Sequence, residues 1–144
     1  MIRKSVATLF CLALVGWLGI AAAQVPDAPM EIKGAKTVNA DMIITLIENE
    51  KGLIIIDNRR VEDFKAGHIE GAKRILDTDL TIEKLAELVP QKTLPVLFYC
   101  NGLKCGRAAK AVELAVAQGY NKVFYYALGM DEWKKQSLPL VTVN

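Results

Sequence analysis

Residues 95–119 read PVLFYCNGLKCGRAAKAVELAVAQG, an apolar run, a loop with two glycines and an alanine-rich segment in succession. The run from Pro95 to Tyr99 predicts a strand that is buried on both faces. The segment from Arg107 to Gln118 has helical spacing and ends at Gly119, where a C-terminal glycine is favoured. Cys100 therefore lies at a turn from strand to helix. Backbone N–H groups and a helix N-terminus favour negative charge at such a turn, which converts a thiol into a thiolate nucleophile.

Apolar runs alternate with helical segments along the rest of the chain, which predicts an α/β fold with a central parallel sheet and helices on both of its faces. Further strands are expected at Leu53 to Ile56, Ala72 to Leu76 and Val123 to Tyr126. Helices are expected at residues 42–48, capped by Asn39 or Asp41, and at residues 61–65, 81–89 and 130–135. Ligands of such sheets bind beyond the carboxyl ends of the strands, so Asp57 and Cys100, which each follow a strand, are expected to reach one site.

Residues 1–23 have the order expected of a secretory signal peptide, with basic residues, a long apolar stretch and then small residues ending at Ala23. We expect cleavage near Ala23, export to the periplasm or out of the cell, and no membrane span in the mature protein. An uncleaved N-terminal anchor is the alternative, because the apolar run approaches the ~18 residues at which a membrane span becomes plausible. Residues 24–36 are expected to form an extended lead-in and residues 37–144 a single domain.

Charge and cysteine content limit the classes of partner. Without Arg3 and Lys4 of the expected leader, the 18 basic and 16 acidic residues of the 144-residue chain come into balance, so we expect no nucleic-acid partner. The two cysteines of the mature chain, Cys100 and Cys105, lie in one loop. Cysteines separated by four residues supply only two metal ligands, and His68 is the sole histidine, so we expect neither a zinc site nor another cofactor.

Three segments of the chain, in this order, resemble a single-domain rhodanese, a module of the sulfurtransferase type. They are IIIDNRRVEDFKAGHIEGA at residues 54–72, YCNGLKCGRAAKA at residues 99–111 and QGYNKVFYYALGMDEW at residues 118–133. The likeness extends from about Ala35 to Val143, nearly the whole expected mature chain. It implies the rhodanese-like α/β fold with a central parallel sheet, and catalysis by the cysteine that opens the loop.

The resemblance also implies roles for individual residues. Carried over by position, Cys100 is the nucleophile, and Asp57 and Arg59 either support its loop or pair only with each other. The expected substrate-binding residues, which form an anion cradle, are Asn101, Gly102, Leu103, Lys104, Cys105, Gly106 and Arg107. The implied reaction is sulfur transfer, in which Cys100 takes sulfane sulfur from thiosulfate or a similar anion as a persulfide. Cyanide or a thiol then accepts the sulfur, and a thiol protein is a possible acceptor or reductant.

Two departures from the pattern of the family leave the substrate open. The family usually has its closing arginine five residues after the cysteine, whereas Arg107 is seven after Cys100, and Met130 stands where a second glycine is usual. The longer loop is similar to that of dual-specificity phosphatases and arsenate reductases, which bind a larger anion, and these are the alternative enzymes. A non-catalytic thiol redox module that uses Cys100 and Cys105 is the alternative from another class.

Three further residues have competing interpretations. Cys105 either resolves a modified Cys100 into a disulfide, which requires the two Cα atoms to come within ~7 Å, or is a passive loop residue. His68 lies at a turn that the family uses structurally, so a structural role is favoured over a cysteine–histidine dyad. Asp63 is expected on a solvated face.

Overall fold

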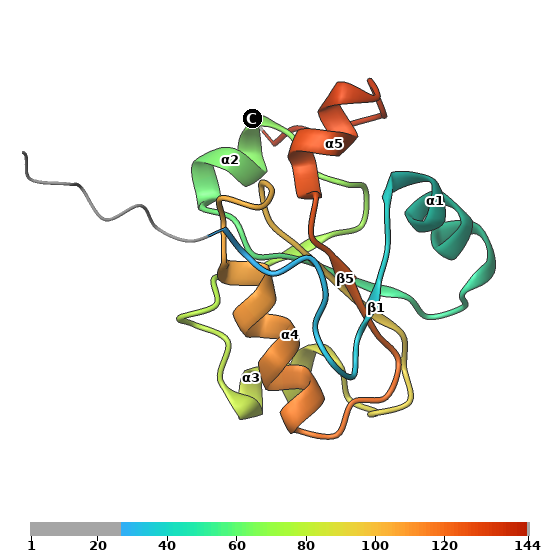
Figure 1. The fold of residues 1–144 in the computed structure, drawn as a ribbon, viewed down its shortest axis with the longest axis vertical. Coiled ribbons are helices and arrows are strands. Elements are labelled where there is room, and N and C mark those ends of the chain that lie inside the picture. Colours follow the sequence, from blue (N-terminus) through green and yellow to red (C-terminus); the bar gives the residue numbers. More distant parts are fainter. Residues whose placement is uncertain (1–26, 144) are drawn as a thin grey trace, which may run out of the picture.

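The computed structural model describes residues 27–143, which form a parallel sheet with helices on both faces (Figure 1). The described strands stand in the order β1-β5-β4-β2-β3, and every neighbouring pair is parallel. The strands are β1 (Lys36–Thr37), β2 (Ile54–Asp57), β3 (Lys73–Arg74), β4 (Val96–Tyr99) and β5 (Val123–Tyr126). The helices are α1 (Ala40–Asn49), α2 (Val61–Ala66), α3 (Ile82–Leu88), α4 (Arg107–Ala117) and α5 (Gly129–Lys135). The predicted α/β class and parallel sheet are confirmed.

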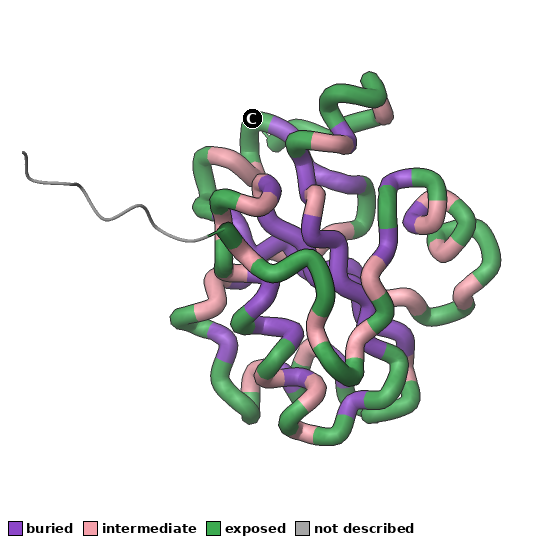
Figure 2. The backbone as a smooth tube through the Cα atoms, in the orientation of Figure 1, coloured by how far each residue is buried: buried purple, intermediate pink, exposed green. Residues whose placement is uncertain are grey.

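The central strand β4 is buried on both faces, as its uninterrupted apolar sequence predicts. Successive side chains of a strand point to opposite faces of the sheet. Val96 and Phe98 therefore pack into one core with residues of α3 and α4, while Leu97 and Tyr99 pack into a second core with residues of α1 and α5. Figure 2 shows the buried strands between these two layers. Two cores thus fix β4, and with it the position of Cys100.

Local capping signals set where the helices begin. The side chain of Asn39 accepts a hydrogen bond of 2.9 Å from the N–H of Met42, so Asn39, rather than the alternative Asp41, caps α1. Thr81 caps α3 in the same way, through the N–H of Lys84 at 3.2 Å. The start of α4 differs, because its N-cap is Gly106, which has no side chain to cap it.

The strands differ from the predicted ones mainly at the edges of the sheet. β1 straddles the end of the expected lead-in and is stabilised by pairing with β5. Its two residues form no apolar run, so the sequence pattern does not predict this strand. β3 has only the two residues Lys73–Arg74. β2 is shifted by one residue, so Asp57 is the last residue of the strand rather than the first after it.

The predicted leader, residues 1–23, lies outside the described residues. In residues 27–143, no helix has both the length and the apolar character needed to cross a membrane. The lead-in residues that are described pass over the loop after β4. There the N–H of Ala28 donates to the carbonyl of Leu103 at 2.7 Å, and the hydroxyl of Tyr125 donates to the carbonyl of Pro29 at 3.0 Å.

Candidate active site

Helix α5 fixes the start of the loop that joins β4 to α4. Cys100 follows β4 directly and is only 2% exposed. The N–H of Met130 donates to the carbonyl of Cys100 at 3.0 Å, and the N–H of Asp131 donates to the carbonyl of Asn101 at 2.7 Å. The carbonyl and the N–H of one trans peptide point in opposite directions. The N–H groups of Asn101 and Gly102 therefore point away from α5.

Most backbone N–H groups of the loop are unpaired. Those of residues 101–104, 106 and 107 donate to no other residue of the described chain, while the N–H of Cys105 donates to the carbonyl of Gly102 at 2.9 Å. The N-terminus of α4 adds its own uncapped N–H groups beside them. Unpaired N–H groups at the N-terminus of a helix attract anions. The residues predicted to form an anion cradle thus lie in one loop next to Cys100.

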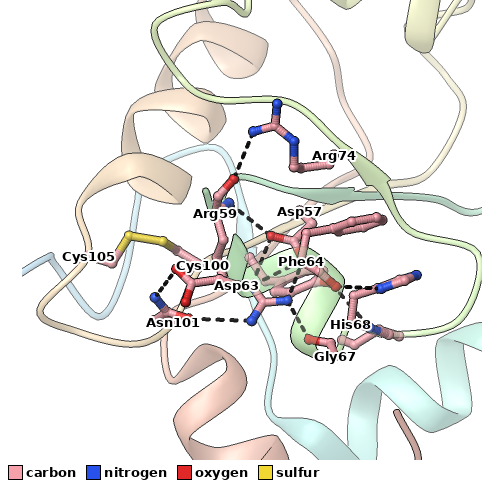
Figure 3. A network of polar contacts seen from close by, with 12 residues as sticks. Asp57, Arg59, Asp63, Phe64, Gly67, His68, Arg74, Cys100, Asn101 and Cys105 are labelled. Atoms are coloured by element: carbon pink, nitrogen blue, oxygen red, sulfur yellow. Dashed lines mark hydrogen bonds and ion pairs between the residues drawn. A yellow bond between two sulfur atoms is a disulfide. The ribbon is translucent and has the colours of Figure 1, made fainter. Parts of the chain in front are cut away.

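Cys100 and Cys105 are joined by a disulfide within this loop (Figure 3). Their Cα atoms lie 6.1 Å apart, inside the range that a disulfide requires. Cys105 is partly exposed, whereas Cys100 is buried. The structure therefore contains the pair that one interpretation of Cys105 predicted, and Cys105 is the more exposed residue of the two.

The basic side chains of the loop point to different partners. Arg107 Nη1 donates to Cys105 Sγ at 3.5 Å, and its Nε lies 3.7 Å from a carboxylate oxygen of Asp77. The ammonium of Lys104, which is 84% exposed, pairs with Asp27 at 2.5 Å. Arg107 is therefore the cation beside the cysteines, while Lys104 points out to the lead-in.

Asp57 and Arg59 form a fully buried ion pair behind the loop (Figure 3). Arg59 Nη2 lies 2.7 Å from Asp57 Oδ2, and Arg59 Nε donates to both carboxylate oxygens at 3.0 and 3.1 Å. The same guanidinium donates to the carbonyl of Gly67 at 2.8 Å and to Asn101 Oδ1 at 3.5 Å. Burial opposes the charge of Arg59, but the hydrogen bonds and the negative charge of Asp57 outweigh it and raise the pKa of Arg59. The two residues pair with each other, and Arg59 also contacts the loop.

Two residues of this network were not predicted as site residues. The hydroxyl of Tyr99 donates to Asp57 Oδ2 at 2.6 Å, and burial together with that carboxylate raises the pKa of Tyr99. The carboxylate of Asp63 accepts a hydrogen bond of 3.2 Å from Asn101 Nδ2, so Asp63 contacts the loop rather than only solvent. The sequence contains one signal that could have identified Tyr99, a polar hydroxyl at the end of a buried strand. The surface pattern of α2 contains no comparable signal for Asp63.

His68 lies at a structural position. Its ring stacks on Phe64 with 3.7 Å between the ring centroids, its Nδ1 lies 2.9 Å from the carbonyl of Phe64, and its backbone pairs with Val141. These contacts agree with the structural role favoured for it. Among residues 27–143, no group of three or more His, Cys, Asp and Glu side chains is arranged to bind a metal ion.

A cavity of about 620 Å³ adjoins the loop on its α5 side. Leu103 and Lys104 line it from the loop, and Leu128, Asp131 and Lys135 line it from α5 and the residue before that helix. Neither cysteine is part of its lining. Space for a molecule larger than a small anion therefore lies beside the loop, apart from the disulfide.

Comparison with known proteins gives a consistent result. Residues 39–136 match the family model for the rhodanese-like domain. The uncharacterized protein YibN of Escherichia coli (strain K12) is 31% identical over 98 residues, which cover 67% of this chain and 66% of that protein. The chain thus spans slightly less than two thirds of the length of this curated relative.

Solved structures extend the likeness to three dimensions. A thiosulfate sulfurtransferase from Pseudomonas aeruginosa has a TM-score of 0.66 at 21% identity, over 76% of this chain and 21% of that one, and this likeness shows the fold alone. A rhodanese with anions from E. coli has a TM-score of 0.52 at 28% identity, over 63% of this chain and 99% of that one. Because the family model covers well over half of its residues, this chain belongs to the family of rhodanese-like domain proteins.

Proposed function

We propose that this protein is a sulfurtransferase that carries sulfane sulfur as a persulfide on Cys100, with thiosulfate or a similar small anion as the donor. The observation that carries the proposal is the place of Cys100, which lies at the end of β4 beneath a loop with unpaired backbone N–H groups. Membership in the rhodanese-like family supports the same class of reaction.

In the first half-reaction, the Cys100 thiolate attacks the outer sulfur of thiosulfate. A bond forms between that sulfur and Cys100 Sγ, while the sulfur–sulfur bond of thiosulfate breaks and sulfite leaves with the electron pair. The N–H groups of Asn101 and Gly102 and the cation of Arg107 stabilise the anionic sulfur as it is transferred. The thiolate must be free for this step, so the reaction begins from the reduced protein, after the bond to Cys105 is opened.

In the second half-reaction, a nucleophile removes the outer sulfur from Cys100. Cyanide would leave as thiocyanate, and a thiol would leave as a persulfide. The cavity on the α5 side of the loop, which Leu103 and Lys104 line, gives a thiol protein a surface on the same loop on which to bind. We propose such a protein as the acceptor or the reductant.

The test is to incubate reduced Cys105→Ser protein with thiosulfate and to measure its intact mass. We expect a gain of one sulfur atom, which cyanide then removes as thiocyanate, and no gain on Cys100→Ser. A Cys105→Ser protein without the adduct would contradict the proposal. Hydrolysis of an aryl phosphate or arsenate-dependent thiol oxidation, in place of the adduct, would support the alternative enzymes with a longer loop.

We also propose that residues 1–23 direct export and are removed, so that the domain works in the periplasm or outside the cell. The test is the mass of the N-terminal peptide of protein taken from the periplasmic fraction. A start near residue 24 is expected. Full-length protein that remains with the membranes would instead support the uncleaved anchor.

A further inference from the structure

We infer that Cys105 discharges the persulfide of Cys100 inside the loop, so that the protein releases hydrosulfide and closes the Cys100–Cys105 disulfide. The inference rests on the proposed persulfide and adds to it the resolving thiol, the product and the kind of reductant that resets the site.

Position is the first argument. Hydrogen bonds from α5 fix the carbonyl of Cys100, and a turn closed by the bond from the N–H of Cys105 to the carbonyl of Gly102 brings the chain back towards it. The Cα atoms of the two cysteines are consequently 6.1 Å apart and their sulfurs are bonded. An attacking thiol in the same loop needs no encounter with another molecule, which gives it a large effective concentration.

Charge is the second argument. The thiolate, not the thiol, is the attacking species in exchange between sulfurs. Arg107 Nη1 donates to Cys105 Sγ at 3.5 Å, and α4 begins only two residues after Cys105. A guanidinium and a helix N-terminus beside one sulfur both favour its thiolate form. Arg107 thus acts as a positioning residue for Cys105 as well as a cation near the anion.

Exposure is the third argument. Cys100 is 2% exposed, whereas Cys105 is partly exposed. A thiol from solution therefore has less access to Cys100 Sγ than Cys105 has from within the loop. After the disulfide has closed, the more exposed residue Cys105 is the one that we expect an external thiol to attack, and this attack releases the buried Cys100 as a thiolate.

The discharge balances as a thiol–disulfide exchange. The Cys105 thiolate attacks Cys100 Sγ, a bond forms between the two cysteine sulfurs, and the bond from Cys100 Sγ to the outer sulfur breaks. The outer sulfur leaves with the electron pair and its proton as hydrosulfide. The sulfane sulfur is reduced by two electrons, and the two cysteine sulfurs supply those electrons as they form the disulfide.

The site is reset by a dithiol. One thiolate of the dithiol attacks Cys105 Sγ and releases the Cys100 thiolate, and the second thiol then attacks the mixed disulfide and releases Cys105. In one full cycle, thiosulfate and a dithiol give sulfite, hydrosulfide and the oxidised dithiol. The chemistry therefore points to a dithiol protein as the reductant partner.

The experiment uses the whole expected mature protein, residues 24–144. It is first reduced, then freed of reductant and kept without oxygen. Wild type with thiosulfate is expected to release one hydrosulfide per chain, to lose both free thiols and to show no lasting gain of sulfur. Cys105→Ser and Cys105→Ala are expected to keep the persulfide and to release no hydrosulfide. At a fixed excess of thiosulfate, the rate constant of hydrosulfide release by wild type should not change on tenfold dilution of the protein, because the step occurs within one chain.

The outcomes separate the inference from the function on which it rests. Wild type that accumulates the persulfide with Cys105 still free would overturn the inference and leave the sulfurtransferase proposal intact. Hydrosulfide release that slows in proportion to dilution would also overturn it, since Cys105 would then act between chains. Failure of both Cys105 variants to form the persulfide would instead overturn the proposed function.

Discussion

Replacing Tyr99 with phenylalanine removes one hydroxyl group from the buried network behind the loop. That hydroxyl donates to Asp57 Oδ2 at 2.6 Å and accepts from the N–H of Ile69 at 3.3 Å. A hydrogen bond to a charged group contributes about 1.5–3 kcal/mol, and the buried N–H of Ile69 also loses its acceptor, so we expect Tyr99→Phe to lower the free energy of unfolding by about 2–4 kcal/mol. Asp57 keeps its contacts with Arg59, so the variant is expected to fold.

A matched variant, Tyr120→Phe, distinguishes the effect of losing a hydrogen bond to a charged carboxylate from the effect of losing any buried tyrosine hydroxyl. The hydroxyl of Tyr120 donates to the neutral carbonyl of Val89 at 2.9 Å, and Tyr120 is also buried, so Tyr120→Phe should cost about 1 kcal/mol. The measurement is urea denaturation of the oxidised proteins, compared by midpoint at equal slope. A cost for Tyr99→Phe no larger than that for Tyr120→Phe would refute the reasoning from the buried carboxylate.

The destabilisation caused by Tyr99→Phe is expected to depend on pH. Burial and the charge of Asp57 raise the pKa of Tyr99, while a tyrosine in the unfolded chain ionises near its ordinary value of about 10. The contribution of the neutral hydroxyl is therefore complete below about pH 10 and is lost as the pH rises further, because the unfolded state then gives up its proton first. The stability difference between wild type and Tyr99→Phe should shrink above about pH 10. A difference that stays constant to about pH 11 would contradict the raised pKa.

Other substitutions test the remaining contacts of the site. Arg59→Met leaves the Asp57 carboxylate buried without its cation, so the same urea titration should show a loss of about 3–5 kcal/mol. Arg107→Gln removes the cationic donor to Cys105 Sγ, so hydrosulfide release should slow about 5–10-fold at pH 7 and recover at higher pH. An equal slowing at every pH would contradict the role of Arg107 in forming the Cys105 thiolate. Lys104→Ala removes an exposed ion pair with the lead-in and should change the stability by less than about 1 kcal/mol, whereas a larger loss would show that this pair fixes the loop.

The sequence predicts the parts of the site that depend on local signals. An apolar run followed by Cys100, two glycines and a segment with helical spacing is sufficient to place a cysteine between β4 and α4. The contact between Tyr99 and Asp57 depends instead on register. Asp57 of β2 pairs with Tyr99 of β4 in the sheet, which brings together two side chains that are 42 residues apart in the sequence.

Side-chain contacts from the helices were harder to predict for the same reason. The short helix α2 has no buried residue, so its pattern marks Asp63 as a surface residue. Its carboxylate meets Asn101 only because the chain after β2 passes next to the loop after β4. The direction of Arg107 towards Cys105 likewise depends on the exact start of α4, which propensity defines only to within a residue or two.

The length of the loop gives the reason why its second cysteine affects the outcome of the chemistry. The turn that the bond from the N–H of Cys105 to the carbonyl of Gly102 closes lies inside a loop in which Arg107 is seven residues after Cys100, and it returns a thiol to Cys100. Without a second thiol in the loop, a persulfide on Cys100 would need an acceptor from outside. In the inferred cycle, Cys105 supplies that acceptor from within the loop. If the inference holds, reduced wild type releases the sulfur as hydrosulfide, whereas the Cys105 variants hand it to an acceptor from outside, with the same loop binding the donor in both.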